Sequence, residues 1–182
     1  MVCYPTPLYV RGMKKLLSIA ACIVAVTTNA QQCKYELDEL DVFTKQRHVV
    51  TEANLSLSVS VATRYLFDLT GDEYRLKFKL TNSAVSAVPA EGVLYVKLAN
   101  DSVLMFRATA TAEPEWNELY RWVNVTYEAD RARFESMSLS PVVRVRIMFQ
   151  SSSLEYEVDQ TRKNQAKIQQ AVRCLLEKTG GL

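Results

Sequence analysis

Apolar and polar residues alternate with a period of two along much of this chain. The alternation is clearest over residues 55–61, 74–81 and 143–149, and weaker over 93–99, 102–108, 119–127 and 153–158. A period of two puts one set of side chains in a core and the other in water, as in a half-buried β-strand. Residues 34–41 and the pair Val49-Val50 predict additional edge strands.

Short polar segments separate these strands, as β-hairpins require. Asn100-Asp101 suits a tight turn, and Thr70-Gly71-Asp72 and Ser151-Ser152 join two further pairs of strands. Seven or more short strands joined by such turns predict a mainly-β fold. We expect an antiparallel β-sandwich-like domain and regard a barrel as the alternative.

Two segments have helical character instead. Residues 129–137 predict a short helix that stops before Pro141. The last segment predicts a longer C-terminal α-helix, with Asp159 as its N-cap and Gly180 at its end. Its apolar residues recur at helical spacing and form one stripe, made of Ile168, Val172, Leu175 and Leu176.

The first thirty residues have the pattern of a secretory signal peptide. Lys14 and Lys15 form a basic start, residues 16–26 are apolar and uncharged, and residues 27–30 are small or polar. The apolar run is shorter than the roughly 20 residues that span a bilayer. We therefore expect cleavage after Ala30, and a single mostly-β domain over residues 31–182 with no transmembrane helix.

Residues 1–12 sit upstream of this pattern and are interpreted as an over-extended start, with the gene beginning at Met13. Two alternatives to the signal peptide remain open. Ile19-Ala20-Ala21-Cys22 fits a lipoprotein processing box, which would attach lipid to Cys22, and residues 16–26 also fit a buried helix.

Removing the predicted signal peptide changes the charge of the chain. The whole sequence has 22 Lys and Arg against 20 Asp and Glu, but Arg11, Lys14 and Lys15 lie in the first thirty residues, which hold no acid. Residues 31–182 therefore carry a net charge of −1. A nearly neutral domain gives no electrostatic reason to expect a nucleic-acid partner.

Two cysteines, Cys33 and Cys174, remain after Cys3 and Cys22 are removed with the signal peptide. An exported protein meets oxidising conditions, so we expect these two thiols to form a disulfide. A catalytic or metal-binding cysteine is the alternative, which the single histidine of the chain, His48, makes less attractive.

The two ends of the predicted mature chain carry a family resemblance. Cys33-Lys34-Tyr35 is followed by an acidic run and by Asp41-Val42-Phe43-Thr44. This start resembles that of small exported, uncharacterised proteins of Bacteroidota-type bacteria. The resemblance implies a final hairpin over residues 142–158 and a helix with a late cysteine, here Cys174. It implies a compartment, periplasmic, cell-surface or secreted, and no activity.

Motifs for catalysis and cofactor binding are weak in this sequence. His48 lies in a polar segment, no GxSxG motif surrounds any serine, and no glycine-rich loop follows a strand. Four acids near the start offer oxygen ligands for calcium, namely Glu36, Asp38, Glu39 and Asp41. On a regular strand the first two would face away from the last two, so we interpret them as a charged edge strand. The sequence thus predicts no cofactor and no metal site.

The strongest candidate for binding is the segment that holds both tryptophans. Trp116 follows Pro114 and is expected in a loop, whereas Tyr120 and Trp122 are expected on one face of the next strand. Flat aromatic rings beside Asn and Glu suit a sugar or peptide surface, because they give large contact area at small entropy cost. The alternative is that these rings fill the core.

We therefore expect a non-enzymatic accessory or binding domain of the envelope or the secreted fraction, with a glycan or an envelope protein as its partner. A small secreted hydrolase acting on glycans or peptides is the first alternative, since paired carboxylates in a cleft would suffice for glycoside hydrolysis. A structural or inhibitor-like domain is the second.

Overall fold

The computed structural model describes residues 33–56, 61–149 and 155–179 of the 182-residue chain. The predicted signal peptide, its cleavage site after Ala30, Cys22, the Ser151-Ser152 turn and Gly180 lie outside the described residues. The described part forms two antiparallel sheets packed with a C-terminal helix, so the predicted mainly-β fold class is confirmed.

The larger sheet has six strands in the order β1-β2-β3-β4-β8-β7. Their bounds are Tyr35–Leu40 (β1), Arg47–Ser56 (β2), Ala62–Thr70 (β3), Glu73–Thr81 (β4), Arg121–Ala129 (β8) and Pro114–Trp116 (β7). In β4, Leu76, Phe78 and Leu80 are buried while the residues between them are more exposed, as the period of two predicts. Gly71, with φ of 58°, makes the tight turn from β3 to β4.

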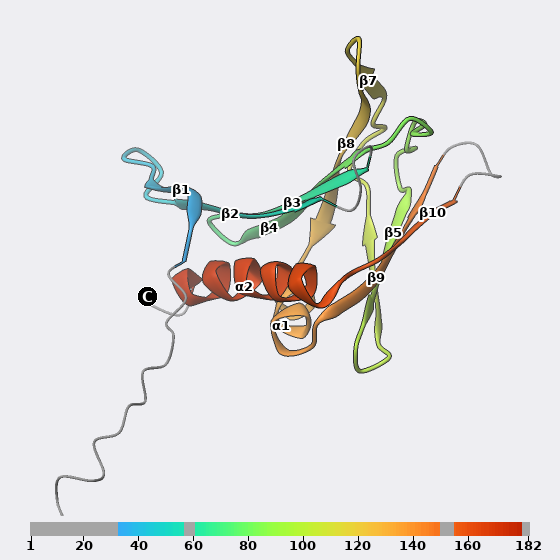
Figure 1. The fold of residues 1–182 in the computed structure, drawn as a ribbon. Helices are drawn as coiled ribbons and strands as arrows, with labels where there is room; N and C mark the ends of the chain where they lie inside the picture. Colours follow the sequence, from blue (N-terminus) through green and yellow to red (C-terminus); the bar gives the residue numbers. More distant parts are fainter. Residues whose placement is uncertain (1–32, 57–60, 150–154, 180–182) are drawn as a thin grey trace, which may run out of the picture. The chain divides into compact units, whose positions relative to one another are not determined.

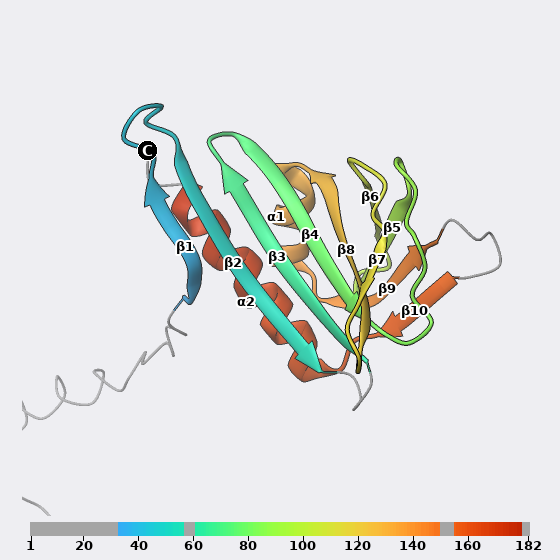
Figure 2. The same cartoon turned by 90° about the horizontal axis from the view of Figure 1, so that it is seen from above.

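The smaller sheet has four strands in the order β10-β9-β5-β6. Their bounds are Glu155–Asp159 (β10), Val142–Met148 (β9), Val93–Leu98 (β5) and Val103–Arg107 (β6). The two sheets meet where Ala108, just after β6, bridges Tyr127 of β8, and the amide of Thr109 donates to the carbonyl of Thr126 at 2.9 Å. Buried apolar residues of both sheets belong to one core, and the ribbon views show the four-stranded sheet beside β8 of the six-stranded one (Figures 1 and 2).

Two helices complete the fold. Helix α1 spans Arg131–Leu139, and Asp130 caps it by accepting a hydrogen bond from the amide of Arg133. Helix α2 spans Arg162–Thr179 and runs beneath β1, β2 and β3 (Figure 2). The predicted stripe faces the sheet, with Ile168, Val172 and Leu175 fully buried.

Two strand predictions are wrong in position. Strand β2 ends at Ser56 and pairs with β3 so that Ser56 lies opposite Ala62. The segment 55–61 therefore cannot form one continuous strand. Residues 57–60 lie outside the described residues. Val49-Val50 lies within β2, between β1 and β3, and not at an edge. Both errors arise because alternation gives the facing of side chains but not the strand partner.

The predicted N-cap of the last helix is also wrong. Asp159 ends β10, where its carboxylate lies 2.5 Å from Nε of Arg144 on β9. The hydroxyl of Thr161 instead accepts a hydrogen bond from the amide of Asn164 in the first turn of α2. The cross-strand ion pair, which a local motif does not reveal, accounts for the position of Asp159 at the end of the hairpin.

Strand β1 is an edge strand, as predicted, but its acids face differently from the regular pattern. A register shift between Tyr35 and Leu37 separates Glu36 from Asp38. Glu36 lies near Arg64 on the face away from α2, at 3.8 Å, whereas Asp38 reaches Lys178 of α2 at 2.8 Å. The hydrogen bond from Lys178 holds the pKa of Asp38 below its usual range.

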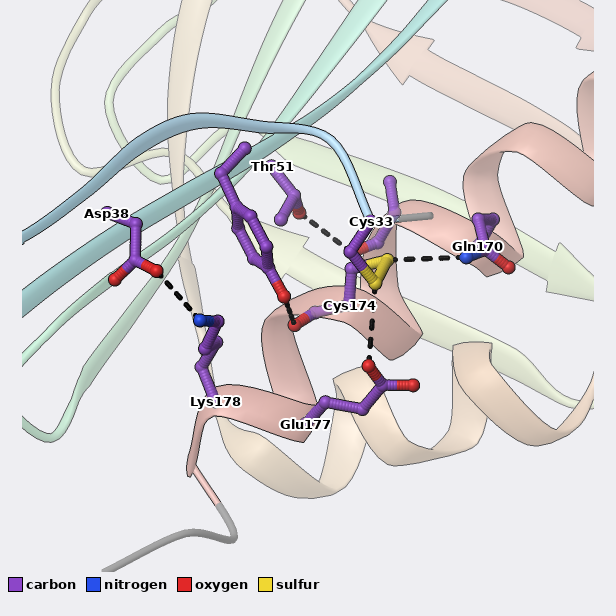
Figure 3. Close-up of a disulfide and its surroundings, with 9 residues drawn as sticks. Cys33, Asp38, Thr51, Gln170, Cys174, Glu177 and Lys178 are labelled. Atoms are coloured by element: carbon purple, nitrogen blue, oxygen red, sulfur yellow. Dashed lines mark hydrogen bonds and ion pairs between the residues drawn. A yellow bond between two sulfur atoms is a disulfide. The ribbon is translucent and has the colours of Figure 1, made fainter. Parts of the chain in front are cut away.

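A disulfide joins the start of β1 to α2, which confirms the predicted pairing of Cys33 with Cys174 (Figure 3). The hydroxyl of Tyr35 donates to the carbonyl oxygen of Cys174 at 3.2 Å, and the hydroxyl of Thr51 on β2 donates to that of Ala171 at 2.7 Å. The amide of Gln170 donates to the sulfur of Cys174 at 3.3 Å. Strands β1 and β2 are thus attached to one stretch of helix.

Replacing both cysteines, as C33S/C174S, should lower the free energy of unfolding by about 2–4 kcal/mol, because the crosslink closes a loop of 141 residues in the unfolded chain. Urea unfolding of the oxidised protein and of the variant measures the difference. Equal transition midpoints would show that the crosslink adds no stability.

Helix α1 anchors its side of the core through one aromatic residue. The ring of Phe134 is fully buried and meets the rings of Phe67 and Tyr74 edge to face, with centroids 5.5 and 5.7 Å apart. Leu139, on the same helix, is 82% exposed. Replacing each of the two residues by alanine therefore compares the loss of a buried side chain with the loss of an exposed one on the same helix.

Phe134→Ala should destabilise the protein by about 3–5 kcal/mol, since it removes a buried ring and leaves a cavity. Leu139→Ala should change stability by less than about 0.5 kcal/mol. Thermal or urea unfolding of both variants provides the measurement, and similar losses in the two would contradict the burial of Phe134.

Candidate functional site

The β7–β8 hairpin ends in a turn, Asn117–Tyr120, that is shaped by its own side chain and backbone. The amide of Asn117 donates to the carbonyl of Tyr120 at 2.9 Å. The side-chain oxygen of Asn117 accepts from the amides of Leu119 and Tyr120 at 3.0 and 2.7 Å. An asparagine that satisfies backbone amides in this way fixes the turn locally, without help from the core.

This turn presents large apolar side chains to solvent. Trp116 and Leu119 are each 81% exposed, and Tyr120 is 50% exposed. In Figure 1 the hairpin projects beyond the neighbouring strands of the six-stranded sheet. Scattered exposed apolar residues are normal on proteins, but three within one short hairpin form a patch, which is typical of an interaction site.

The structure does not bring the three predicted aromatic residues onto one surface. Trp116 lies at the end of β7 rather than in a loop, so that expectation is wrong, although the residue is exposed as predicted. It pairs with Arg121, whereas Glu115 pairs with Trp122. Because cross-strand partners share a face and neighbours in a strand do not, Trp116 and Trp122 face opposite sides of the hairpin.

Trp122 is half-buried, and it has a different neighbour from Trp116. The ammonium group of Lys79 on β4 lies 4.5 Å from the centroid of its ring. This cation–π contact covers one face of the indole. Trp122 therefore belongs to the outer surface of the six-stranded sheet, and Trp116 with Tyr120 forms the exposed part of the candidate site.

A hollow of about 370 Å³ lies beside the turn. The end of β4 and the residues after it form one wall, and the turn forms the other; the lining residues are Thr81, Asn82, Ser83, Trp116, Asn117, Glu118, Leu119, Tyr120 and Arg121. The amide of Asn82 donates to the carbonyl of Arg121 at 3.0 Å and so holds the walls together. Sequence reasoning missed Asn82 and Ser83, because only the pairing of β4 with β8 brings them here, and it missed Arg121, which lies opposite Trp116 in the hairpin.

The charged side chains of this hollow have no ion-pair partner in the described part of the chain. There, neither Glu118 nor Arg121 forms an ion pair, whereas the other three hollows described each contain several ion-paired residues. Among the arginines that the structure describes, only Arg121 and Arg162 have a side chain with neither an ion pair nor a hydrogen bond. The polar groups beside Trp116 are therefore available to a ligand.

His48, the single histidine, pairs with an acid on the outer face of the six-stranded sheet. Its Nε2 lies 3.1 Å from Oδ1 of Asp68, which is 3% exposed. Lys77 donates to the other carboxylate oxygen at 2.5 Å. The ammonium group of Lys77 thus supplies a positive charge beside the buried carboxylate. Asp68 is the only side-chain partner of His48 in the described chain, so no nucleophile is hydrogen-bonded to the histidine there.

Within residues 33–56, 61–149 and 155–179, no group of three or more His, Cys, Asp or Glu is placed to hold a metal ion. Among these residues no helix is long and apolar enough to cross a membrane. Comparisons with family models, curated proteins and solved structures found no match to this chain.

The two tryptophans should differ in their access to solvent. In Trp122→Phe the remaining Trp116 should emit at long wavelength and be strongly quenched by acrylamide, because most of its ring meets water. In Trp116→Phe the remaining Trp122 should be quenched less, since Lys79 and the sheet cover it. Steady-state quenching of both variants tests this placement, and a larger quenching constant for Trp122 would contradict it.

Proposed function

We propose that this protein is an exported, non-enzymatic accessory domain that binds a ligand at its surface through the β7–β8 turn. The observation that carries the proposal is the exposed pair Trp116 and Leu119, beside a hollow whose charged residues form no ion pair with any described residue. Large apolar side chains at such a position bury nothing in the fold. Their contact area is instead available to a partner.

Export to the periplasm, the cell surface or the medium rests on three observations. The first thirty residues have the pattern of a signal peptide. The Cys33–Cys174 disulfide is of a kind that persists in oxidising compartments and is rare in reducing ones. The resemblance to exported proteins of Bacteroidota-type bacteria favours the same compartment.

The rigidity of the support also favours a binding role. Three side chains of β8, Val123, Val125 and Tyr127, are buried in the core. The turn thus extends from a fixed strand and is itself held by Asn117. Sites built on rigid elements lose less entropy on binding than sites on mobile loops.

The proposal predicts that binding depends on Trp116 and Leu119. On an array of immobilised extracellular glycans and peptides, the oxidised protein should bind at least one ligand class. Trp116→Ala and Leu119→Ala should each weaken that binding about tenfold or more, the loss of roughly 1.4 kcal/mol or more that truncating a binding hot spot costs.

Leu139→Ala provides the matched control, because Leu139 is 82% exposed on α1 and lies outside the hollow. This variant should bind as well as the unmodified protein. If all three variants bind equally well, or if no ligand is bound, the β7–β8 turn is not a binding element.

A further inference from the structure

We infer that the hollow beside the β7–β8 turn binds a neutral glycan segment, an inference that rests on the proposed function and names its ligand class. The polar groups of the hollow, its balance of charge and the exposed indole of Trp116 all match the chemistry of a sugar ring.

The indole of Trp116 supplies the apolar part of such a site. An aromatic ring is negative over its face, and the C–H groups on one side of a pyranose ring carry a small positive charge. A sugar ring lying on the indole therefore gains both dispersion and electrostatic attraction. Trp116 is 81% exposed, so its ring is accessible without rearrangement of the core.

Two asparagine amides supply oriented donors from opposite walls. The side-chain oxygen of Asn117 is held by two backbone amides of the turn, and that of Asn82 accepts from the amide of Ala84 at 3.0 Å. Each oxygen faces its backbone donor, which fixes the direction of the amide group. The NH₂ groups have no partner within the described residues and remain able to donate to hydroxyl groups of a ligand.

Acceptors and the second type of donor come from the turn and from the start of β8. Among the described residues, the carboxylate of Glu118 and the guanidinium group of Arg121 have no ion-pair partner, so the hollow carries one charge of each sign that is free to meet a ligand. Adjacent hydroxyls of a sugar both donate and accept hydrogen bonds, and therefore use such a mixture fully. Zero net charge favours a neutral ligand over an acidic or basic polymer.

The size of the site favours a small ligand over a protein surface. The hollow of about 370 Å³ lies within the range of small-molecule sites, about 300–1,000 Å³. A stable protein interface needs about 800 Å² from each partner, spread over some 20–30 residues, whereas this patch belongs to one hairpin turn and the chain beside it.

The test uses the oxidised protein carrying Trp122→Phe, so that Trp116 is the only tryptophan in the sequence. The probes are soluble neutral oligosaccharides of glucose, xylose, mannose and N-acetylglucosamine, added singly. At least one should change the emission of Trp116 in a saturable way, and calorimetry should give the same dissociation constant.

Asn82→Asp and Asn117→Asp then test the proposed donors without destroying the turn. Each keeps the oxygen that accepts from the backbone, replaces the NH₂ group by a second oxygen and adds one negative charge, which Asn100→Asp also adds elsewhere. Each should weaken binding of the sugar about threefold to tenfold, the effect of one hydrogen bond. Asn100→Asp is the matched control, because Asn100 accepts from the amide of Ser102 in the β5–β6 turn, away from the hollow, and its change should leave binding unaltered.

The outcomes separate this inference from the proposed function. Binding of peptides but of no oligosaccharide, still dependent on Trp116, overturns the glycan and leaves the binding turn in place. A bound oligosaccharide that is unaffected by Asn82→Asp and Asn117→Asp places the sugar elsewhere and also overturns the inference. Absence of any Trp116-dependent ligand overturns both.

Discussion

The packing of α2 against the inner face of β2 and β3 is the interaction on which the rest of the structure depends. The two sheets are joined on one side by the bridge between Ala108 and Tyr127, after β6 and on β8. On the other side their edge strands, β1 and β10, do not pair with each other. A core shared by two sheets that meet along one side needs a separate element to exclude water from the other, and α2 is that element.

The attachments around α2 follow from this need. Helix α2 is the last element of the described chain and β1 is the first. Bringing them together on folding closes the longest loop available, and this closure costs the chain conformational entropy. The Cys33–Cys174 crosslink reduces that cost, and the contacts of Tyr35 and Asp38 with the helix act at the same place. These attachments lie at β1, which is the edge of the six-stranded sheet opposite to β7.

Much of this fold was predictable from sequence, because burial on one face produces a period of two or of 3.6 that needs no partner to be recognised. Residues 74–81 and the stripe of Ile168, Val172 and Leu175 are of this kind. Alternation in 55–61 misled because β2 ends at Ser56, and alternation does not show where a strand stops. Asp159 has the chemistry of a cap, yet its cross-strand pairing with Arg144 places it in β10.

The candidate site was predictable only in part, for a related reason. The aromatic cluster is visible in the sequence, but the face of the hairpin that each ring occupies is not. That face depends on the strand register, which pairs Trp116 with Arg121. A register shift of one residue would move each ring to the opposite face. The opposite wall, with Asn82 and Ser83, lies more than thirty positions earlier in the chain. No local pattern connects those residues to the turn before the pairing of β4 with β8 is known.

Because the residues that stabilise the fold differ from those of the proposed binding turn, an exposed turn of this composition is compatible with the fold. The core residues of β8 hold the strand, and Asn117 holds the turn, so neither Trp116 nor Leu119 is required for folding. An exposed patch of this kind increases the tendency to aggregate and adds nothing to the burial of apolar surface. Glu118 and Arg121 likewise form no ion pair among the described residues. Residues that contribute so little to stability, gathered at the end of one hairpin, are the ones that the proposed binding function would use.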